Sequence, residues 1–426
     1  MRNATRRFST SAVQLVLLAL VVIAAFAFSA YSAFGHRPPD WNNAYIAAYS
    51  FSRQHPVYAI TAQGRWEEFR VGLAEQLRVV PAGGSWRYPP LQAVLMIPLL
   101  PFEMWAACSI WNILGSVASL TASFLLAAAL TNDSTLVIAN RCIALMALLF
   151  FVPLYNTLWE CQFNLLPLLS VATGMYFLRH GREASAGVAL AVGTAMKLFP
   201  ASLIAWLLWR RQFRTGVAAV LASIVFTLLS GFIVGWDNIA GYVQYGLRLA
   251  NEGWAIQPPN QSLFAFFARA FTVHPWGPTL VTSPELVEPL TWATRLVLLG
   301  GVAVLCWPRR FSFDLLALEC SLVLVTLFLI APTAWEHHLV MLYVPFVVLG
   351  TRALSGRLSL SACILTIGAY ILIDMQGLLW KQFVGYTSLL SLGTYAMLIL
   401  WAVLAWFILR EKWPGLARQA VQTTHT

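Results

Sequence analysis

The sequence predicts an all-α polytopic membrane protein with roughly 10–12 transmembrane helices. Two observations support this fold class. Of the 426 residues, 59% are hydrophobic and only 10% are charged, whereas soluble domains carry about 25% charged residues. Apolar runs of about 17–25 residues, bounded by Arg, Pro or Trp, match the length that a helix needs to cross about 30 Å of hydrocarbon.

The first apolar run, from Ala12 to Phe34, follows Arg2, Arg6 and Arg7. A basic start before an apolar run is also typical of a cleavable signal, or of a weak twin-arginine signal. This run is long and more spans follow, which favours an uncleaved signal anchor with a cytoplasmic N-terminus. Residues 36–87 are then a long first outer loop, expected to form short helices on the membrane surface.

The next segments along the chain are a short one and then a series of spans. Leu91–Pro101 is shorter than half a span and is bounded by prolines, so we expect it to be interfacial or re-entrant. The predicted later spans are Met104–Leu130, Ala139–Tyr155, Leu165–Leu178, Gly216–Gly235, Leu290–Trp307, Leu315–Ile330, Leu339–Gly350, Leu358–Leu379 and Leu389–Leu409.

The stretch between Arg182 and Arg210 is apolar but contains Lys197 and Pro200 near its middle. Both flanks are basic, so the positive-inside tendency favours a short helical hairpin with its tip at Lys197 and Pro200. Both termini are then cytoplasmic, and several basic clusters fall on the inside: Arg179/Arg182, Arg210/Arg211/Arg214, Arg309/Arg310, Arg352/Arg357 and Arg410/Lys412. We therefore expect the net charge of +10 to reflect orientation in a membrane and not nucleic-acid binding. The expected location is a cell (inner or plasma) membrane, with membrane lipids as neighbours.

The same topology gathers the few polar segments on the outer face of a single domain, residues 1–426. These segments are Asp40, the Glu160–Asn164 turn, a second large outer loop over residues 236–288, and the Glu336-His337-His338 turn. This clustering on one face is the main functional signal in the sequence.

Several classes of site are not supported. The six cysteines are scattered without a CxxC pair, which supports neither a disulfide scaffold nor a zinc site. No Walker A, Rossmann or Asp-x-Asp motif is present, so an activated substrate is expected to be borne by a lipid and not by a nucleotide. We predict no cofactor and no metal.

Asp40 is the candidate general base. It follows the first span directly, in Pro38-Pro39-Asp40-Trp41, where the proline pair stiffens the chain and holds the carboxylate at the membrane surface. Asp40 also precedes a plausible helix, so an N-cap role is an open alternative.

Two other motifs carry groups suited to catalysis or binding. Trp335-Glu336-His337-His338 places an acid and two imidazoles at the outer end of a span, where a histidine could orient Asp40 or share its proton, unless the turn is only an interfacial cap. Lys197 is a charge at membrane depth, which costs about 2.5–3.5 kcal/mol and indicates a phosphate partner, a salt bridge or snorkelling. Competing phosphate contacts are Arg248, Arg269 and Lys381.

Polar and aromatic residues of the outer turns suit sugar hydroxyls, which need hydrogen-bond donors, acceptors and flat apolar faces. The candidates for donor or acceptor binding are Tyr88, Glu160, Gln162, Asn164, Asn260, Gln261, Trp335 and Glu336, together with Lys197.

The order of these motifs resembles glycosyltransferase family 87, membrane enzymes of the GT-C class. The resemblance rests on Asp40, Tyr88-Pro89-Pro90-Leu91, Gln162-Phe163-Asn164, Lys197-Leu198-Phe199-Pro200, Asn260-Gln261-Ser262 and Pro332 through His338. Cys161 stands where a glycine is common in that family.

The resemblance implies a GT-C-like fold and an inverting transfer on the outer face. The donor would be a polyprenyl-phosphate sugar, with mannose expected, and the acceptor a glycan or glycolipid. Asp40 would be the base, His337 or His338 would assist it, and Lys197 or an outer Arg would hold the phosphate. The alternatives are a transporter or flippase of a lipid-linked glycan, which has no need of Asp40, and a protein O-mannosyltransferase, which differs only in its acceptor.

Overall fold

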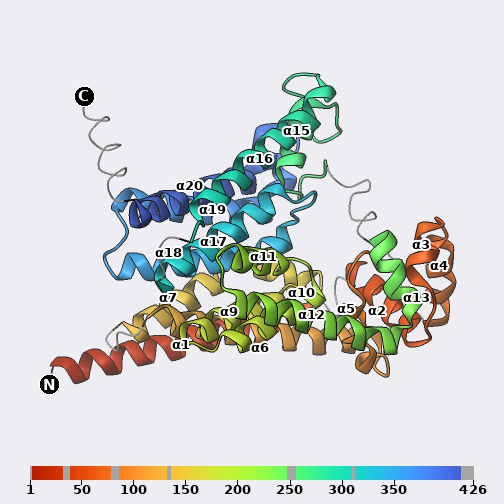
Figure 1. Ribbon diagram of the computed structural model, residues 1–426, viewed down its shortest axis with the longest axis horizontal. Helices are drawn as coiled ribbons and strands as arrows, with labels where there is room; N and C mark the ends of the chain where they lie inside the picture. The colour runs from red at the N-terminus through yellow and green to blue at the C-terminus, as the bar shows by residue number, and fades with distance from the viewer. Residues whose placement is uncertain are drawn as a thin grey trace.

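The computed structural model describes residues 2–31, 39–77, 86–131, 136–246, 256–308 and 312–413. Apart from two isolated β-bridges, the regular elements of these residues are all helical, which confirms the predicted fold class. The longer helices lie side by side along the long axis of the molecule (Figure 1). The first helix, α1 (Arg2–Tyr31), covers most of the predicted signal anchor.

Among the described residues, seven helices are long and apolar enough to cross a membrane, or up to eight if one bent pair is a single span. They contain α6 (Met104–Leu130), α12 (Phe213–Val234), α16 (Val287–Leu305), α17 (Phe313–Ile330), α18 (Tyr343–Leu354), α19 (Leu360–Leu379) and α20 (Leu392–Lys412). The roughly 10–12 transmembrane helices expected from the sequence are reached only when the shorter apolar helices are also counted.

The bent pair occupies the predicted span Ala139–Tyr155. It consists of α7 (Val137–Leu149) and α8 (Val152–Trp159), which meet at 52°. Pro153 lies in the first turn of α8, where its missing N–H costs nothing. The Asp374 carboxylate of α19 accepts a hydrogen bond from the Val152 N–H at 2.9 Å and so caps α8 in place of a local residue.

The predicted hairpin is present. Helices α10 (Glu183–Met196) and α11 (Ala201–Trp209) are 14 and 9 residues long, and the chain breaks between them at Lys197–Pro200. Helix α10 packs between α9 (Leu165–Arg179) and α12. The approach to α12 is close at Gly187, where a Cβ would come within 2.4 Å of the Thr215 carbonyl oxygen.

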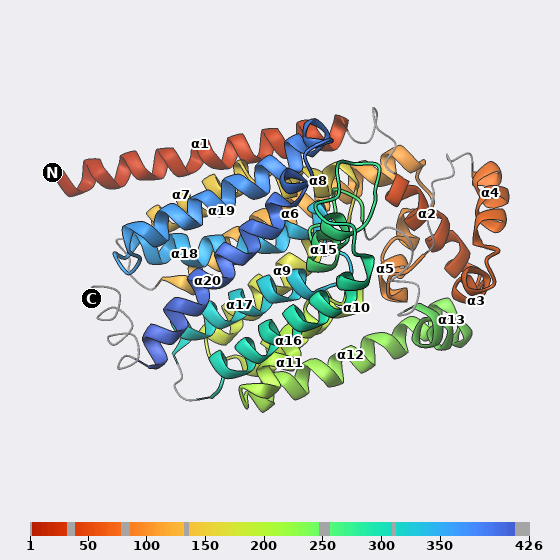
Figure 2. The same ribbon diagram turned by 90° about the horizontal axis from the view of Figure 1, so that it is seen from above.

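One end of the bundle holds the basic clusters. Glu319 of α17 is fully buried and lies 2.9 Å from the Arg210 Nε and 2.7 Å from the Lys412 Nζ. Arg357 pairs with Asp314, and Arg352 with Glu411, at the same end. The start of α1 and the end of α20 lie there too (Figures 1 and 2). Arg309 and Arg310 lie outside the described residues.

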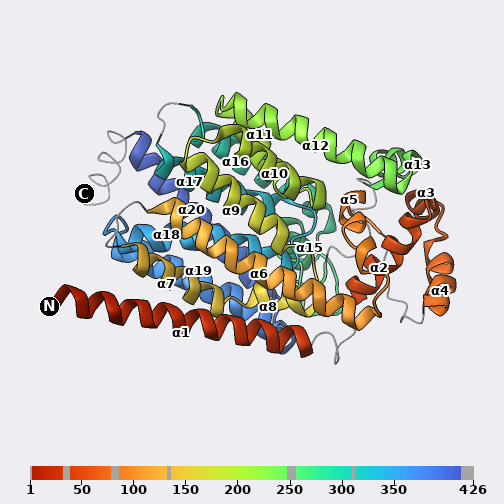
Figure 3. The ribbon, with the colours of Figure 1, turned by 90° about the horizontal axis from the view of Figure 1, so that it is seen from below.

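The opposite end carries the first loop. Its short helices are α2 (Pro39–Ser52), α3 (Val57–Ala62), α4 (Trp66–Leu77) and α5 (Pro90–Val94), with a 3-10 turn at Ile97–Leu99. Helix α13 (Trp236–Gly241) lies beside α3 (Figure 3). The buried aromatic residues Trp41 and Trp86 belong to the core of this end. The segment Leu91–Pro101, expected to be interfacial or re-entrant, contains only α5 and the 3-10 turn, which are shorter than a span.

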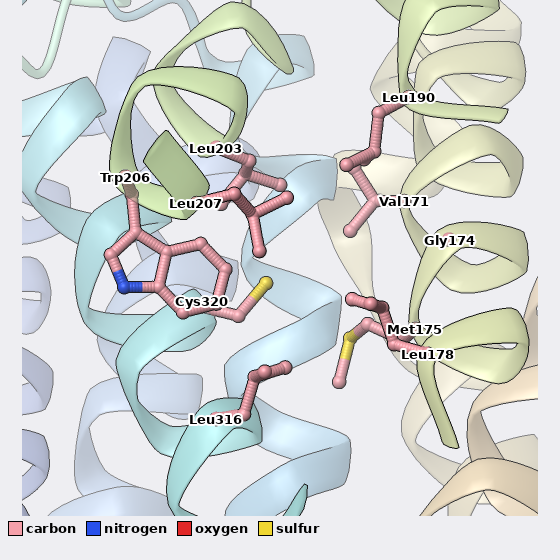
Figure 4. A pocket seen from close by; sticks show the side chains of 10 residues that line it. All are labelled: Val171, Gly174, Met175, Leu178, Leu190, Leu203, Trp206, Leu207, Leu316 and Cys320. Atoms are coloured by element: carbon pink, nitrogen blue, oxygen red, sulfur yellow. The ribbon is translucent and has the colours of Figure 1, made fainter. Parts of the chain in front are cut away.

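A small apolar cavity lies in the bundle between α9, α10, α11 and α17 (Figure 4). Its lining consists of Val171, Gly174, Met175, Leu178, Leu190, Leu203, Trp206, Leu207, Leu316 and Cys320. The lining contains none of the candidate site residues, so this cavity is a packing gap in the apolar core and not the place where chemistry is expected.

Candidate functional site

Asp40 is half-buried and lies in the first turn of α2, where the positive end of the helix dipole stabilises its negative charge. Its Oδ2 accepts a hydrogen bond from the Gln162 Nε2, which belongs to the turn between α8 and α9. Burial raises the pKa of Asp40 above its ordinary value, while the Lys197 charge and the Gln162 hydrogen bond act in the opposite direction. A raised pKa makes this carboxylate a stronger base.

Lys197 lies among several of the predicted site residues. Its side chain is only 3% exposed, because the break between α10 and α11 turns it into the protein. The ammonium group donates to the Gln162 Oε1 at 3.0 Å and to the Asn164 Oδ1 at 2.6 Å. It also faces the ring of Tyr88, 5.0 Å from the ring centroid.

The ionisation of Lys197 depends on Asp40. Burial lowers the pKa of Lys197 to about 7, and the negative charge of Asp40 opposes that shift. The two residues are therefore charge partners at a distance, and Gln162 bridges them with both ends of its amide.

Asn164 extends this arrangement to the His337 turn. Its Nδ2 donates to the main-chain oxygen of His337 at 2.7 Å, and the Thr157 hydroxyl donates to the same oxygen at 3.0 Å. We call Asp40, Gln162, Lys197 and Asn164, with the His337 carbonyl, the Asp40–Lys197 network. It joins four segments that are far apart in the sequence.

The two histidines lie beside this network and not on Asp40. Among the described residues, Gln162 and neither histidine donates a hydrogen bond to the Asp40 carboxylate. The His338 ring packs edge-on against Phe199, with centroids 4.9 Å apart, and its Nδ1 accepts from the Trp335 N–H. The Nε2 of His337 is buried without a hydrogen-bond partner, whereas the His338 ring also has a hydrogen bond with the Thr333 main chain.

Two further predicted residues surround Asp40. Tyr88 shares a side-chain hydrogen bond with Gln162, and burial, followed by the Asp40 charge, raises the pKa of its hydroxyl. Burial and the Asp40 charge raise the pKa of Glu160 to about 8. Glu160 is therefore mostly protonated at neutral pH, where it can donate a hydrogen bond as well as accept one.

Glu336 lies nearby with one buried oxygen, Oε1, that has no hydrogen-bond partner. Its carboxyl group shares a side-chain hydrogen bond with Gln376 of α19.

Asn260 and Gln261 use their amides on the main chain. Asn260 Oδ1 accepts from the Ala334 N–H at 2.8 Å, and an isolated β-bridge pairs Asn260 with Trp335. Gln261 Nε2 donates to the carbonyls of Pro258 and Leu390. Asn260 thus holds the segment before Glu336 in place, and Gln261 joins its own loop to the segment before α20. Direct contact of either residue with a sugar stays a prediction.

The competing phosphate contacts differ in their surroundings. Arg269 of α15 (Leu263–Phe271) is fully buried and donates to the carbonyls of Gln257 and Asn260 and to the Ser391 hydroxyl. Lys381 is exposed beside Trp380. Arg248 lies outside the described residues. Of the cations compared, Lys197 is the one bonded into the network with Asp40.

The cysteine prediction is wrong in one respect, because Cys108 and Cys161 form a disulfide with Cα atoms 6.2 Å apart. The two cysteines are separated by 53 residues and follow no local spacing motif, so the sequence alone carries no signal for the pair. No group of three or more potential metal ligands is found among the described residues.

Comparison with known proteins identifies a family. The model of glycosyltransferase family 87 matches residues 86–333, a range that includes Tyr88, Gln162 and Lys197 but neither Asp40 nor His337. A relative from Mycobacterium tuberculosis, named polyprenol-phosphate-mannose-dependent alpha-(1-2)-phosphatidylinositol mannoside mannosyltransferase, is 26% identical over 284 residues, 62% of this chain and 61% of its own length.

A protein of the same name from Mycolicibacterium smegmatis is 29% identical over 219 residues. That match covers 47% of each chain. This chain thus matches less than two thirds of the length of either relative.

Proposed function

The chain belongs to glycosyltransferase family 87, and on this premise we propose that it is a membrane mannosyltransferase that uses a polyprenyl-phosphate-mannose donor. The acceptor is a glycan or glycolipid, and a phosphatidylinositol mannoside is the first candidate because the names of both relatives specify it. The observation that carries this proposal is the Asp40–Lys197 network, which holds a carboxylate and a buried cation at a fixed separation.

The network suits an inverting displacement. Asp40 takes the proton of the acceptor hydroxyl, the hydroxyl oxygen attacks the anomeric carbon, and the bond to the polyprenyl phosphate breaks. The leaving phosphate needs positive charge more than a proton. Lys197 donates two of its three N–H groups to Gln162 and Asn164, which leaves the third for a phosphate oxygen of the donor. His337 offers an unpaired ring nitrogen to the sugar or the phosphate, and His338 packs beside it.

We place the reaction on the outer face of the membrane. The basic clusters around Glu319 and Asp314 lie at the end of the bundle opposite the first loop, as expected for a cytoplasmic end. The Cys108–Cys161 disulfide belongs to the other end, with Gln162, and disulfides persist in oxidising compartments. Both features support the same orientation.

The direct test incubates purified protein with radiolabelled polyprenyl-phosphate mannose and a phosphatidylinositol mannoside. We expect labelled acceptor and free polyprenyl phosphate to appear in equal amounts, because each transfer releases one phosphate. A flippase would move the donor between leaflets of a vesicle without consuming it. Movement without transfer would therefore exclude the transferase and favour the transporter.

A further inference from the structure

The turn that carries Gln162 is held by one face of α6. Asn112 Nδ2 donates to the Leu158 carbonyl at 2.9 Å, and Trp111 Nε1 donates to the Gln162 carbonyl at 3.4 Å. The Trp111 and Phe163 rings are 4.5 Å apart, and at Gly115 a Cβ would come within 2.9 Å of Leu165. Positions 108, 111, 112 and 115 share one helix face.

The covalent contact on this face is the Cys108–Cys161 disulfide. Both cysteines are 1% exposed. Cys161 has a φ of +46°, in the left-handed region that favours glycine, and it directly precedes Gln162. A non-glycine residue therefore keeps this conformation at the position where the main chain turns to aim the Gln162 amide.

We propose that the Cys108–Cys161 disulfide is a positioning device for the transferase site, which holds the Gln162 amide between Asp40 and Lys197 and makes turnover sensitive to reduction. The proposal rests on the proposed function. Each partner of Gln162 is on a different segment, Asp40 on α2 and Lys197 after α10, so a displaced turn loses both contacts together.

The redox step is an ordinary disulfide exchange. A small dithiol gives two electrons and two protons: the bond between the Sγ atoms breaks, two thiols form, and the dithiol closes to its own disulfide. In the cell, an exchanging disulfide of the outer compartment takes two electrons and two protons from the thiols to re-form the bond. The site is assembled fully only in the oxidised protein.

The test compares wild type, before and after treatment with the dithiol, with Cys108→Ala and Cys161→Gly. Mass spectrometry of the untreated protein should find Cys108 and Cys161 joined. Glycine relaxes the left-handed turn while removing the disulfide, so it separates the covalent link from the backbone conformation. Cys363→Ser, which changes a free cysteine of α19, is the matched control and should leave the rate unchanged.

We expect reduction and Cys108→Ala each to lower kcat by roughly 10- to 100-fold, since a displacement of about 1 Å costs that much. Cys161→Gly should lose less. The acidic limb of the kcat/KM profile should also move to higher pH, because the Gln162 hydrogen bond holds the pKa of Asp40 down. Both cysteine variants should be insensitive to the dithiol.

Three results would overturn this inference while the proposed function stands: free thiols at both positions in active, untreated protein; an unchanged kcat and acidic limb after complete reduction; or a lower Tm as the only effect. Absence of transfer by the oxidised wild type has a different meaning, because it overturns the proposed function itself.

Discussion

Replacement of Asp40 by Asn tests the base directly. Asn keeps the size of the side chain, and its Oδ1 can still accept the hydrogen bond from Gln162 Nε2. The variant therefore loses the negative charge and the proton-accepting group with little loss of packing. A general base contributes about 10²- to 10⁴-fold, which corresponds to roughly 2.7–5.4 kcal/mol of transition-state stabilisation. We expect kcat to fall by at least the lower factor.

Donor binding needs a separate measurement, because Asp40 also acts on Lys197. The Asp40 charge raises the pKa of Lys197 against the effect of burial, which lowers it to about 7. In Asp40→Asn the negative charge beside Lys197 is absent, so the pKa of Lys197 falls further and the ammonium group loses its proton at a lower pH than in wild type. Donor affinity should equal that of wild type well below pH 7 and weaken more steeply than in wild type as the pH rises.

The assay is release of polyprenyl phosphate under saturating donor, with donor affinity followed in parallel by equilibrium binding. Asp237→Asn is the matched control, since Asp237 is an exposed carboxylate in the first turn of α13 and belongs to no described part of the network. If Asp40→Asn turned over near the wild-type rate, the assignment of the base would be wrong.

Three further changes test other features. Lys197→Met orphans two buried amide oxygens, which cost about 1–3 kcal/mol each; donor affinity should fall while the folded protein still inserts, and unchanged affinity would refute the phosphate role. Burial raises the pKa of Glu160 in the folded protein from its ordinary 4.5 to about 8, so the stability of the protein should decline as the pH rises between these two values. Glu160→Gln should flatten the dependence of Tm on pH, and an unaltered dependence would contradict this. Glu319→Leu strands two buried cations and should cost about 3–5 kcal/mol of unfolding free energy, with kcat per folded molecule preserved.

The sequence predicted the features that depend on local pattern. The boundaries of α6 were predicted without error, because an uninterrupted apolar run defines them. The hairpin followed from the two basic flanks and from Lys197 with Pro200. The burial cost of Lys197 indicated a phosphate partner, a salt bridge or snorkelling. The structure instead pairs its ammonium group with the amide oxygens of Gln162 and Asn164, and the phosphate role stays a prediction.

Pairing across the chain was not predictable. Glu319 lies in the middle of an apolar run, and its partners are 109 and 93 residues away in sequence, in Arg210 and Lys412. The link from Asp40 to a histidine, expected from side-chain chemistry, is replaced by an amide bridge through Gln162. The bend between α7 and α8 had a signal in Pro153, but the distant cap by Asp374 did not.

The ion cluster around Glu319 bears on the order in which the protein is made. Arg210 is synthesised before Glu319, so the carboxylate can meet its first cation as soon as α17 enters the membrane. Lys412 is the last residue of α20, and it also donates to the carbonyls of Leu305 and Trp307. Without the end of α20, the carbonyls of Leu305 and Trp307 lose this donor. The buried Glu319 carboxylate then keeps only Arg210 as its positive partner. Closure of the bundle at this end therefore depends on α20, because the charges around Glu319 balance only when Lys412 lies beside them.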